Sequence, residues 1–411
     1  MVTFLLIIIY LAFISLGLPD SLLGAAWPAM QPDLGARLET AGYLFMIVAG
    51  GTIVSSLMSG KLLKRFGTGK VTFVSVFMTA VALLGFHLSP SVFWLILCAI
   101  PLGLGAGAVD AGLNDYVATH YKAHHMSWLH CFWGVGATLG PIIMSQFISG
   151  DNSWRSGYFV IAIIQFVLVI ILFFTLPLWK KVAKVGHSPS KENEEDIIEK
   201  MAAKEDNDLK PLQIKGVKLG LVSFLFYCGV EATVNLWGSS FLVDIKGVNA
   251  ATAAGWVSFY FAGITVGRLV TGFITFKMNN RSLIRVGQLT ALIGAIILFL
   301  PLPSFFSLVG FIIVGLGLAP IFPCMLHETP ARFGKKHSQT IMGYQMAVAY
   351  TGTTFMPPLL GLMASHLSIG IFPICVVLFV IAMLLSSEKL NRILKNKVFV
   401  KQDENKGSTV L

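Results

Sequence analysis

The stretch that decides the fold runs from Val92 to Ala118 and reads VFWLILCAIPLGLGAGAVDAGLNDYVA. A helix needs about 20 predominantly apolar residues to cross the hydrocarbon core of a bilayer, and this stretch is long enough. One carboxylate, Asp110, lies well inside it. A charge at membrane depth costs at least about 2.5–3.5 kcal/mol on insertion scales, so such a residue usually faces a water-filled path and has a function there.

Apolar stretches of this kind recur along the whole chain of 411 residues. Hydrophobic residues make up 55% of the chain and charged residues 12%, with a mean hydropathy of +0.77. A soluble domain carries roughly 25% charged residues. We therefore predict an all-α integral membrane protein with twelve transmembrane helices, near 3–27, 41–60, 71–88, 92–118, 126–148, 156–179, 217–243, 251–276, 284–301, 304–327, 339–364 and 368–387.

The net charge of +10 follows a membrane topology and does not indicate a nucleic-acid partner. With the N-terminus inside the cell, three of the 30 Lys and Arg residues fall in outer loops, namely Arg37, Arg155 and Lys246. Arg268 lies inside an apolar stretch, and the others lie in segments predicted to be cytoplasmic. This is the positive-inside pattern, and it predicts a multi-pass protein of the plasma or inner membrane with both termini in the cytoplasm.

The chain divides into two similar halves. A strongly mixed-charge run from Lys191 to Asp208 interrupts the apolar rhythm after the sixth predicted helix. The sequence GLG at 103–105 recurs at 315–317, and Pro141 has a counterpart in Pro357. We predict a six-helix bundle at 1–180, a cytoplasmic linker at 181–215, a second six-helix bundle at 216–390 and a cytoplasmic tail at 391–411. Two six-helix halves that rock around a site at the midplane are the architecture of major facilitator transporters.

One short motif carries the resemblance to that superfamily. Residues 60–67, GKLLKRFG, resemble its signature between the second and third helices, although Lys64 stands where the signature has an acidic residue. The resemblance implies that Lys64 and Arg65 belong to a cytoplasmic gate. Arg268, after Gly267, occupies the corresponding place in the second half and is assigned to the gate with them. Pro320 and Pro323 in the tenth predicted helix are further gate candidates.

A closer resemblance involves three helices. The segments that carry it are Gly103 to Gly105 with Asp110 and Asn114, then Asp20 with Leu22, Leu23 and Pro28, then His130 to Pro141 with its glycines. They are similar to the fourth, first and fifth helices of fucose-permease-type sugar:proton symporters. That group also includes sodium-dependent glucose transporters. The resemblance implies coupled uptake of a sugar.

Two carboxylates of the first half are candidates for ion coupling. Asp110 and Asn114 lie four residues apart, on one helix face. Asp20 follows Pro19, whose ring removes a helix hydrogen bond and frees a carbonyl. Burial favours the neutral form of a carboxyl, so both side chains are suited to taking up a proton. The structural alternatives are a hydrogen bond between helices for Asp110 and a wetted polar group in the outer vestibule for Asp20.

The second half offers a polar row for substrate binding. Tyr227, Glu231 and Asn235 recur every four residues on an otherwise apolar helix, so they share a face that we expect to line the central cavity. Hydroxyl groups of a sugar would bond to the carboxylate and amide while an aromatic ring stacks on its apolar face. Trp133 and Tyr260 are candidates for that ring, and His130 and Gln345 for further polar contacts. Packing, or a place at the membrane interface, is the competing explanation for these four.

The sequence therefore predicts a secondary active transporter that takes up a monosaccharide or similar small polar solute together with a proton. A proton-coupled exporter of a drug or metabolite and a sodium-coupled sugar symporter remain as alternatives. No Gly-rich phosphate loop and no nucleophile with an adjacent base occur, so an enzyme is not expected. We expect a monomer in the lipid bilayer that uses no cofactor and no metal site.

Overall fold

The computed structural model describes the chain except for residues 1, 122, 150–152, 186–210, 275–276 and 408–411. Within the described residues, every element is an α-helix or a short 3-10 helix. This agrees with the all-α membrane fold predicted from the sequence. The predicted charged linker lies largely outside the described residues.

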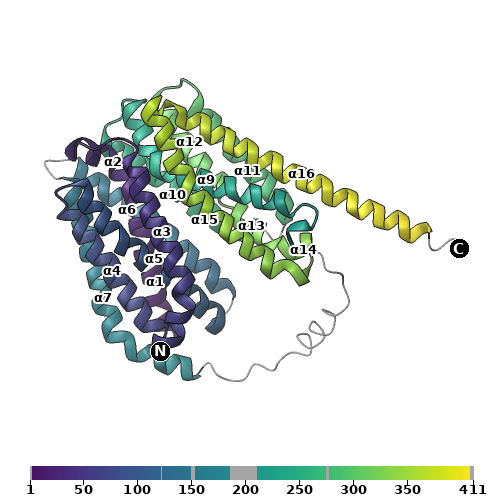
Figure 1. The fold of residues 1–411 in the computed structure, drawn as a ribbon, viewed down its shortest axis with the longest axis horizontal. Coiled ribbons are helices and arrows are strands. Elements are labelled where there is room, and N and C mark those ends of the chain that lie inside the picture. The colour runs from purple at the N-terminus through teal and green to yellow at the C-terminus, as the bar shows by residue number, and fades with distance from the viewer. Residues whose placement is uncertain (1, 122, 150–152, 186–210, 275–276, 408–411) are drawn as a thin grey trace.

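The first group of helices contains the elements before the charged segment (Figure 1). They are α1 (Val2–Asp20), α2 (Leu22–Asp33), α3 (Thr40–Phe66), α4 (Thr68–His87), α5 (Val92–His120), α6 (Ala123–Ile148) and α7 (Trp154–Val185). Within this group α3 and α4 both pack against α5, and α1 packs against α6.

The second group contains the elements after the charged segment. They are η1 (Pro211–Gln213), α9 (Val217–Asp244), α10 (Ala250–Ile274), α11 (Asn280–Phe299), α12 (Ser304–Leu318), α13 (Ile321–His327), α14 (Thr329–Phe333), α15 (Lys335–His366), η2 (Ile369–Ile371) and α16 (Phe372–Gly407). Here α11 packs against α12, and α15 and α16 pack against α9.

Two predicted helices are broken in the structure. The first stretch continues to Asp33 as α1 and α2, and Ser21 separates the two. The tenth is divided at Ala319 and Pro320 into α12 and α13. α16 continues without interruption to Gly407 and so includes most of the predicted tail.

Eleven segments among the described residues are long and apolar enough to cross a membrane. α1 and α2 form one of them, and α12 and α13 another. The predicted helix missing from these eleven is the one at 339–364, which corresponds to α15; its 32 residues are long enough but more polar than those of the others. Polar residues on a helix inside a membrane protein are expected to face protein or water rather than lipid.

The two groups meet mainly through three helix pairs, α6 with α10, α3 with α15, and α2 with α9. Their helices lie side by side at the end that carries α2, called here the α2 end (Figure 1). They diverge towards the opposite end, which carries the N-terminus and α14 and is called here the α14 end (Figure 1). At the α2 end, Ser145 Oγ of α6 donates to the Ala251 carbonyl of α10 over 2.7 Å, and Ser239 Oγ of α9 donates to the Ala25 carbonyl of α2 over 3.4 Å.

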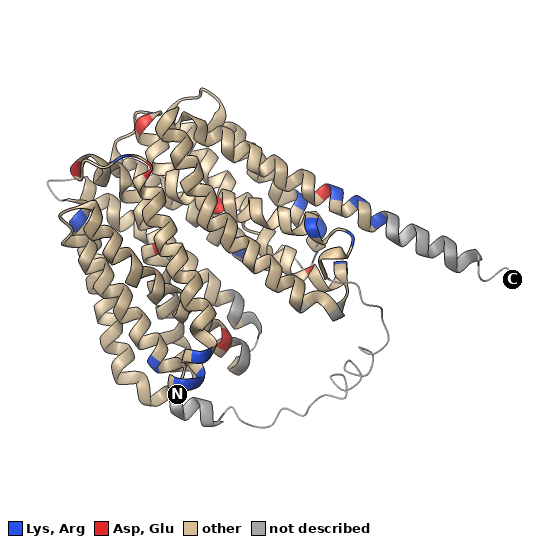
Figure 2. Cartoon of the chain, in the orientation of Figure 1, with Lys and Arg blue, Asp and Glu red and all other residues tan. Residues whose placement is uncertain are grey.

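Charged side chains are concentrated at the ends of the bundle (Figure 2). Lys and Arg gather near the N-terminus, around α14 and in the middle of α16 (Figure 2). A few acidic residues lie along the helix bodies instead (Figure 2). Charge that stays inside a membrane bundle is expensive, so these interior residues are where function is sought.

Candidate functional site

A series of contacts joins an acidic side chain of the first group to an ion pair of the second. Trp133 on α6 donates a hydrogen bond from Nε1 to Asp20 Oδ2 of α1 over 2.8 Å. The Arg268 guanidinium of α10 lies over the Trp133 ring, with its Cζ 5.7 Å from the ring centroid. Arg268 in turn pairs with Glu231 of α9, with 3.4 Å between Nη2 and Oε1. We call these four residues the central network.

The ion pair of the central network keeps access to solvent although it lies deep in the bundle. The Glu231 side chain is 23% accessible and the Arg268 side chain 18%. Arg268 faces Trp133 of the other group, so this accessible surface borders the space between the groups. His130, one turn before Gly134 on α6, is also exposed and interacts electrostatically with Arg268. A partly wetted space lined by charges of both groups is what a polar ligand requires.

The backbone around Asp20 is unusually rich in partners. Pro19 has no N–H, so the Ser15 carbonyl four residues earlier lacks its helical donor. The amide of Gln165 on α7 donates to that carbonyl instead, which confirms the predicted freed carbonyl. The Asp20 carbonyl accepts a hydrogen bond from Asn235 Nδ2 of α9 over 3.0 Å. The Asp20 backbone is thus tied directly to the second group.

The predicted polar row of α9 borders the central network. Tyr227 is fully buried, and its hydroxyl interacts electrostatically with Glu231 and Arg268. The hydroxyl of Tyr227 and Oδ1 of Asn235 are buried without an aligned hydrogen-bond partner among the described residues. Tyr260 of α10 donates from its hydroxyl to the Glu231 carbonyl over 3.3 Å. Its ring is fully buried, so Tyr260 holds the backbone of α9 and presents no face to a ligand.

Two glycines allow the close helix contacts that hold Trp133. A Cβ on Gly17 of α1 would overlap the carbonyl oxygen of Trp133. A Cβ on Gly134 of α6 would overlap Oγ1 of Thr265 on α10. Only glycine permits both approaches, and α6 is therefore held between α1 of its own group and α10 of the other.

Asp110 lies in a second polar cluster, on α5. Asn114 Nδ2 donates to Asp110 Oδ1 over 2.9 Å and to the Asp110 carbonyl over 3.0 Å, so the predicted shared face is present. Tyr350 of α15 hydrogen-bonds the side chain of Ser56 on α3 and interacts electrostatically with Asp110. Asp20 also interacts electrostatically with Asp110. The Asp110 carboxylate thus has a neighbour in the second group, whereas Asp20 reaches that group through its backbone carbonyl and through Trp133.

Tyr350 is not among the residues predicted from the sequence. Arg268 is predicted to belong to the cytoplasmic gate by analogy with the first half, and in the structure it pairs with Glu231 in the central network, a contact that the sequence does not predict. The low hydropathy of α15, with Tyr350, Thr353 and Thr354 in one run, was the signal that could have identified a cavity-facing helix.

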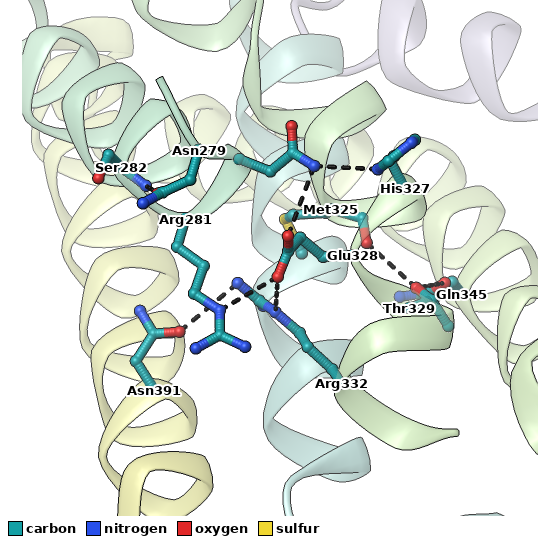
Figure 3. A network of polar contacts seen from close by, with 11 residues as sticks. Asn279, Arg281, Ser282, Met325, His327, Glu328, Thr329, Arg332, Gln345 and Asn391 are labelled. Atoms are coloured by element: carbon teal, nitrogen blue, oxygen red, sulfur yellow. Dashed lines mark hydrogen bonds and ion pairs between the residues drawn. The ribbon is translucent and has the colours of Figure 1, made fainter. Parts of the chain in front are cut away.

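Gln345 lies away from the central network, whereas His130 stays beside Arg268. Gln345 is 2% exposed, and its Oε1 accepts a hydrogen bond from Thr329 Oγ1 of α14 over 3.0 Å (Figure 3). Gln345 is therefore placed with α14 and not with Glu231. The imidazole of His130 packs edge-on against the Phe13 ring, with 5.9 Å between centroids.

The gate candidates lie at helix ends. Lys64 and Arg65 are exposed in the last turn of α3, and the Arg65 guanidinium lies 5.3 Å from the Phe66 ring centroid. Pro320 immediately precedes α13, and Pro323 lies within its first turn. Both prolines therefore mark the break in the predicted tenth helix.

A second charged cluster braces the α14 end of the second group (Figure 3). Glu328 Oε2 accepts from Arg281 Nε of α11 over 3.2 Å and from Arg332 Nε of α14 over 3.3 Å. Arg332 Nη2 donates to Asn391 Oδ1 of α16 over 3.5 Å. Glu328 and Arg332 lie four residues apart and form an ion pair within the cluster. All its members belong to one group, so it holds α11, α14 and α16 together.

Comparison with known proteins gives relatives over most of the chain. "Bypass of stop codon protein 6" of Saccharomyces cerevisiae is 24% identical over 385 residues, covering 88% of this chain and 77% of that protein. The glucose/mannose transporter GlcP of Bacillus subtilis is 23% identical over 322 residues, covering 77% of each chain. The cis,cis-muconate transport protein of Acinetobacter baylyi is 22% identical over 374 residues, covering 88% of this chain and 87% of that protein.

The fold has solved counterparts. The crystal structure of a D-xylose-proton symporter matches with a TM-score of 0.70 at 14% identity, covering 92% of this chain and 96% of that chain. The closer resemblance to fucose-permease-type symporters remains a prediction. The model of the Major Facilitator Superfamily matches residues 9–348 and 221–397, so the chain belongs to this superfamily of membrane transporters and is not an enzyme.

Proposed function

We propose that the protein is a proton-coupled symporter that takes up a monosaccharide or a similar small polar solute by alternating access. The observation that carries the proposal is the pair of interior carboxylates of the first group. One is connected to a side chain of the second group through Trp133, and the other interacts with such a side chain directly. Asp20 contacts Trp133, which contacts Arg268, and Asp110 interacts with Tyr350. Protonation of Asp20 and Asp110 would remove two interior charges and lower the cost of closing the space around them.

The arrangement at Asp110 favours a proton over sodium as the coupling ion. Sodium needs several oxygens around one point. The Asn114 amide donates from its nitrogen to Asp110 Oδ1 and to the Asp110 backbone carbonyl. Its nitrogen therefore adds no oxygen ligand for a cation, while the other carboxylate oxygen of Asp110 could still take up a proton.

The second group supports a neutral, hydroxylated substrate. Glu231 and Arg268 neutralise each other, so the site has no net charge to attract an ion. The Tyr227 hydroxyl and Asn235 Oδ1 lie buried beside that pair without an aligned partner among the described residues, so they would bind a substrate in a conformation that exposes them. Trp133 provides an aromatic surface, although Arg268 covers one face of it. The glucose/mannose transporter among the relatives is consistent with a sugar.

A carboxylate solute is the second candidate, because Arg268 gives the site a cation. A substrate carboxylate would have to replace Glu231 as its partner, and bidentate Arg–carboxylate pairs are strong. The muconate transport protein among the relatives makes this class worth including in any test.

The proposal includes a membrane orientation. Both termini face the cytoplasm, so the α14 end is the inner side and the α2 end the outer side. The inter-group hydrogen bonds of Ser145 and Ser239 then close the outer side, and the protein is in its inward-facing state. We propose a monomer in the plasma or inner membrane, because each chain contains both groups and the site between them.

Solute uptake into proteoliposomes tests the function. A panel of hexoses, pentoses, cis,cis-muconate and 4-hydroxybenzoate is offered under an inward pH gradient, an inward sodium gradient or no gradient. Accumulation of a sugar that requires the pH gradient supports the proposal. Accumulation of an acid alone would select the carboxylate candidate, and a requirement for sodium would exclude proton coupling. Substrate loss from preloaded vesicles under the same inward pH gradient would indicate an exporter.

A further inference from the structure

Trp133 touches both charged systems of the central network with different parts of one side chain. The indole edge donates Nε1–H to Asp20 over 2.8 Å. The indole face lies under the Arg268 guanidinium at 5.7 Å. Asp20 belongs to the first group and Arg268 to the second, so a single ring connects them across the interface.

The backbone of Trp133 is held in place by close helix packing. Gly17 of α1 and Gly134 of α6 bring the backbone of Trp133 into close contact with α1 and that of its neighbour into contact with α10. A change in the hydrogen bond at the indole edge therefore acts on a ring whose backbone is fixed. Reorientation of the ring would move the surface on which Arg268 rests.

Protonation of Asp20 changes that hydrogen bond. A hydrogen bond to a carboxylate is shorter and roughly twice as strong as one between neutral groups. Ionised Asp20 also polarises the indole to which it is hydrogen-bonded, which strengthens the attraction between the ring face and Arg268. When Asp20 gains a proton, both effects weaken, and Arg268 is held more exclusively by Glu231.

We propose that Trp133 is a positioning residue that transmits the protonation state of Asp20 to the Arg268–Glu231 pair. This inference rests on the proposed proton-coupled function and gives it a physical link between ion and substrate. Proton binding in the first group would then alter how the second group holds its ion pair, which borders the proposed substrate site. The link requires the Nε1–H donor and the aromatic face together.

Other charged and titratable groups surround the link and have to be separated from it. Asp20 interacts with Asp110 of α5 and receives the Asn235 amide of α9 on its carbonyl. Arg268 faces Glu231 and Tyr227 of α9, Tyr260 of its own helix, and His130 and Cys131 of α6. His130 is the neighbour that could imitate the effect, because its imidazole is titratable and interacts with Arg268.

The first test is the pH dependence of tryptophan emission in purified protein without substrate. The wild type is compared with Trp133→Phe, which keeps an aromatic face but has no donor. Trp128→Phe, which changes an exposed tryptophan on the same helix, is the matched control. We expect a pH-dependent emission change in the wild type, in Trp128→Phe and in His130→Gln. We expect it to be lost in Trp133→Phe and in Asp20→Asn.

Reciprocity between the two sites provides a sharper result. If Asp20 and the ion pair are coupled, a change in the pair must alter proton binding. Glu231→Gln leaves Arg268 without its anionic partner, and the unpaired cation favours ionised Asp20. The midpoint of the emission change should therefore move to lower pH. An unchanged midpoint, or an emission change that persists in Asp20→Asn, would overturn the proposed link.

Transport separates this link from the proposed function. In proteoliposomes, Trp133→Phe should lose a larger share of its proton-driven accumulation than of its gradient-free exchange. Equal loss of both activities with a wild-type emission change would indicate a merely structural role and refute the link. If the emission change depends on Asp20 but no solute is driven by protons, the proposed function fails and the link stands. Trp133→Tyr replaces Trp133→Phe if the latter does not fold.

Discussion

At the scale of single residues, each charged side chain of the site has an ion-pair or hydrogen-bond partner. Glu231 is paired with Arg268, Asp20 with the indole of Trp133, and Asp110 with the amide of Asn114. Removing one partner of a buried ion pair typically costs about 3–5 kcal/mol, because the other charge is left unpaired. The cost here should be lower than that range, since both members of the Glu231–Arg268 pair retain accessible surface.

A double-mutant cycle tests whether Glu231 and Arg268 act as a pair. We expect Glu231→Gln and Arg268→Gln each to lower the unfolding temperature in detergent, and the double variant to lower it by less than the sum of the two. Thermal unfolding at matched detergent and pH gives the coupling. Strictly additive losses would mean that the two side chains do not interact in the folded protein.

Asp110→Asn tests coupling at the other carboxylate. The amide cannot gain or lose a proton, so pH-driven accumulation should be abolished while exchange between equal substrate pools continues. Uptake and counterflow in the same vesicles measure the two activities. Asp115→Asn is the matched control, because Asp115 lies on an exposed face of the same helix. Unimpaired accumulation in Asp110→Asn would remove Asp110 from the ion pathway.

At the scale of elements, the packing of α1 against α6 depends on small side chains. Gly17→Ala would push a methyl group into the carbonyl of Trp133, and overpacking of this kind typically costs about 1–3 kcal/mol. We expect a lower unfolding temperature and weaker transport. Gly50→Ala on α3 is the control, because a Cβ there meets nothing within 4 Å and alanine is the better helix former. Equal behaviour of the two variants would argue against a close contact between α1 and α6.

At the scale of the whole molecule, the two groups are expected to separate at the α2 end during transport. Cysteines at Ser145 and Ala251, whose side chain and backbone are joined by a 2.7 Å hydrogen bond, should cross-link readily and stop turnover. Reduction should restore uptake. The cross-linking rate is measured with and without substrate, in a background lacking the five native cysteines. Full transport by the cross-linked protein would exclude opening at this end.

The fold could be predicted from the sequence, because apolar stretches of about 20 residues indicate membrane-crossing helices and basic loops indicate the side of the membrane on which they lie. The i, i+4 geometry of Asp110 and Asn114 and the carbonyl freed by Pro19 were likewise local consequences of helix geometry. Contacts between distant helices were not accessible. Arg268 was assigned to the gate by its position in the repeat, and only its approach to Glu231 and Trp133 assigns it to the centre. Tyr350 was not predicted, because the low hydropathy of α15 does not indicate which of its residues approaches Asp110.

The break at Ser21 has a mechanical consequence for the first membrane crossing. α1 packs against α6 and α7 of its own group, whereas α2 packs largely against α9 and α10 of the other. The crossing therefore contacts both groups, which the proposed mechanism moves relative to one another, and the break between α1 and α2 lies one residue beyond Asp20. If α1 and α2 move with different groups, the bending is concentrated at Ser21, which is next to the Asp20 carboxylate. A single residue inserted at this break would turn α2 by about 100° and move its packing face away from α9. The charged residues of the site would all be present, but the contact between the two groups at the α2 end would be lost.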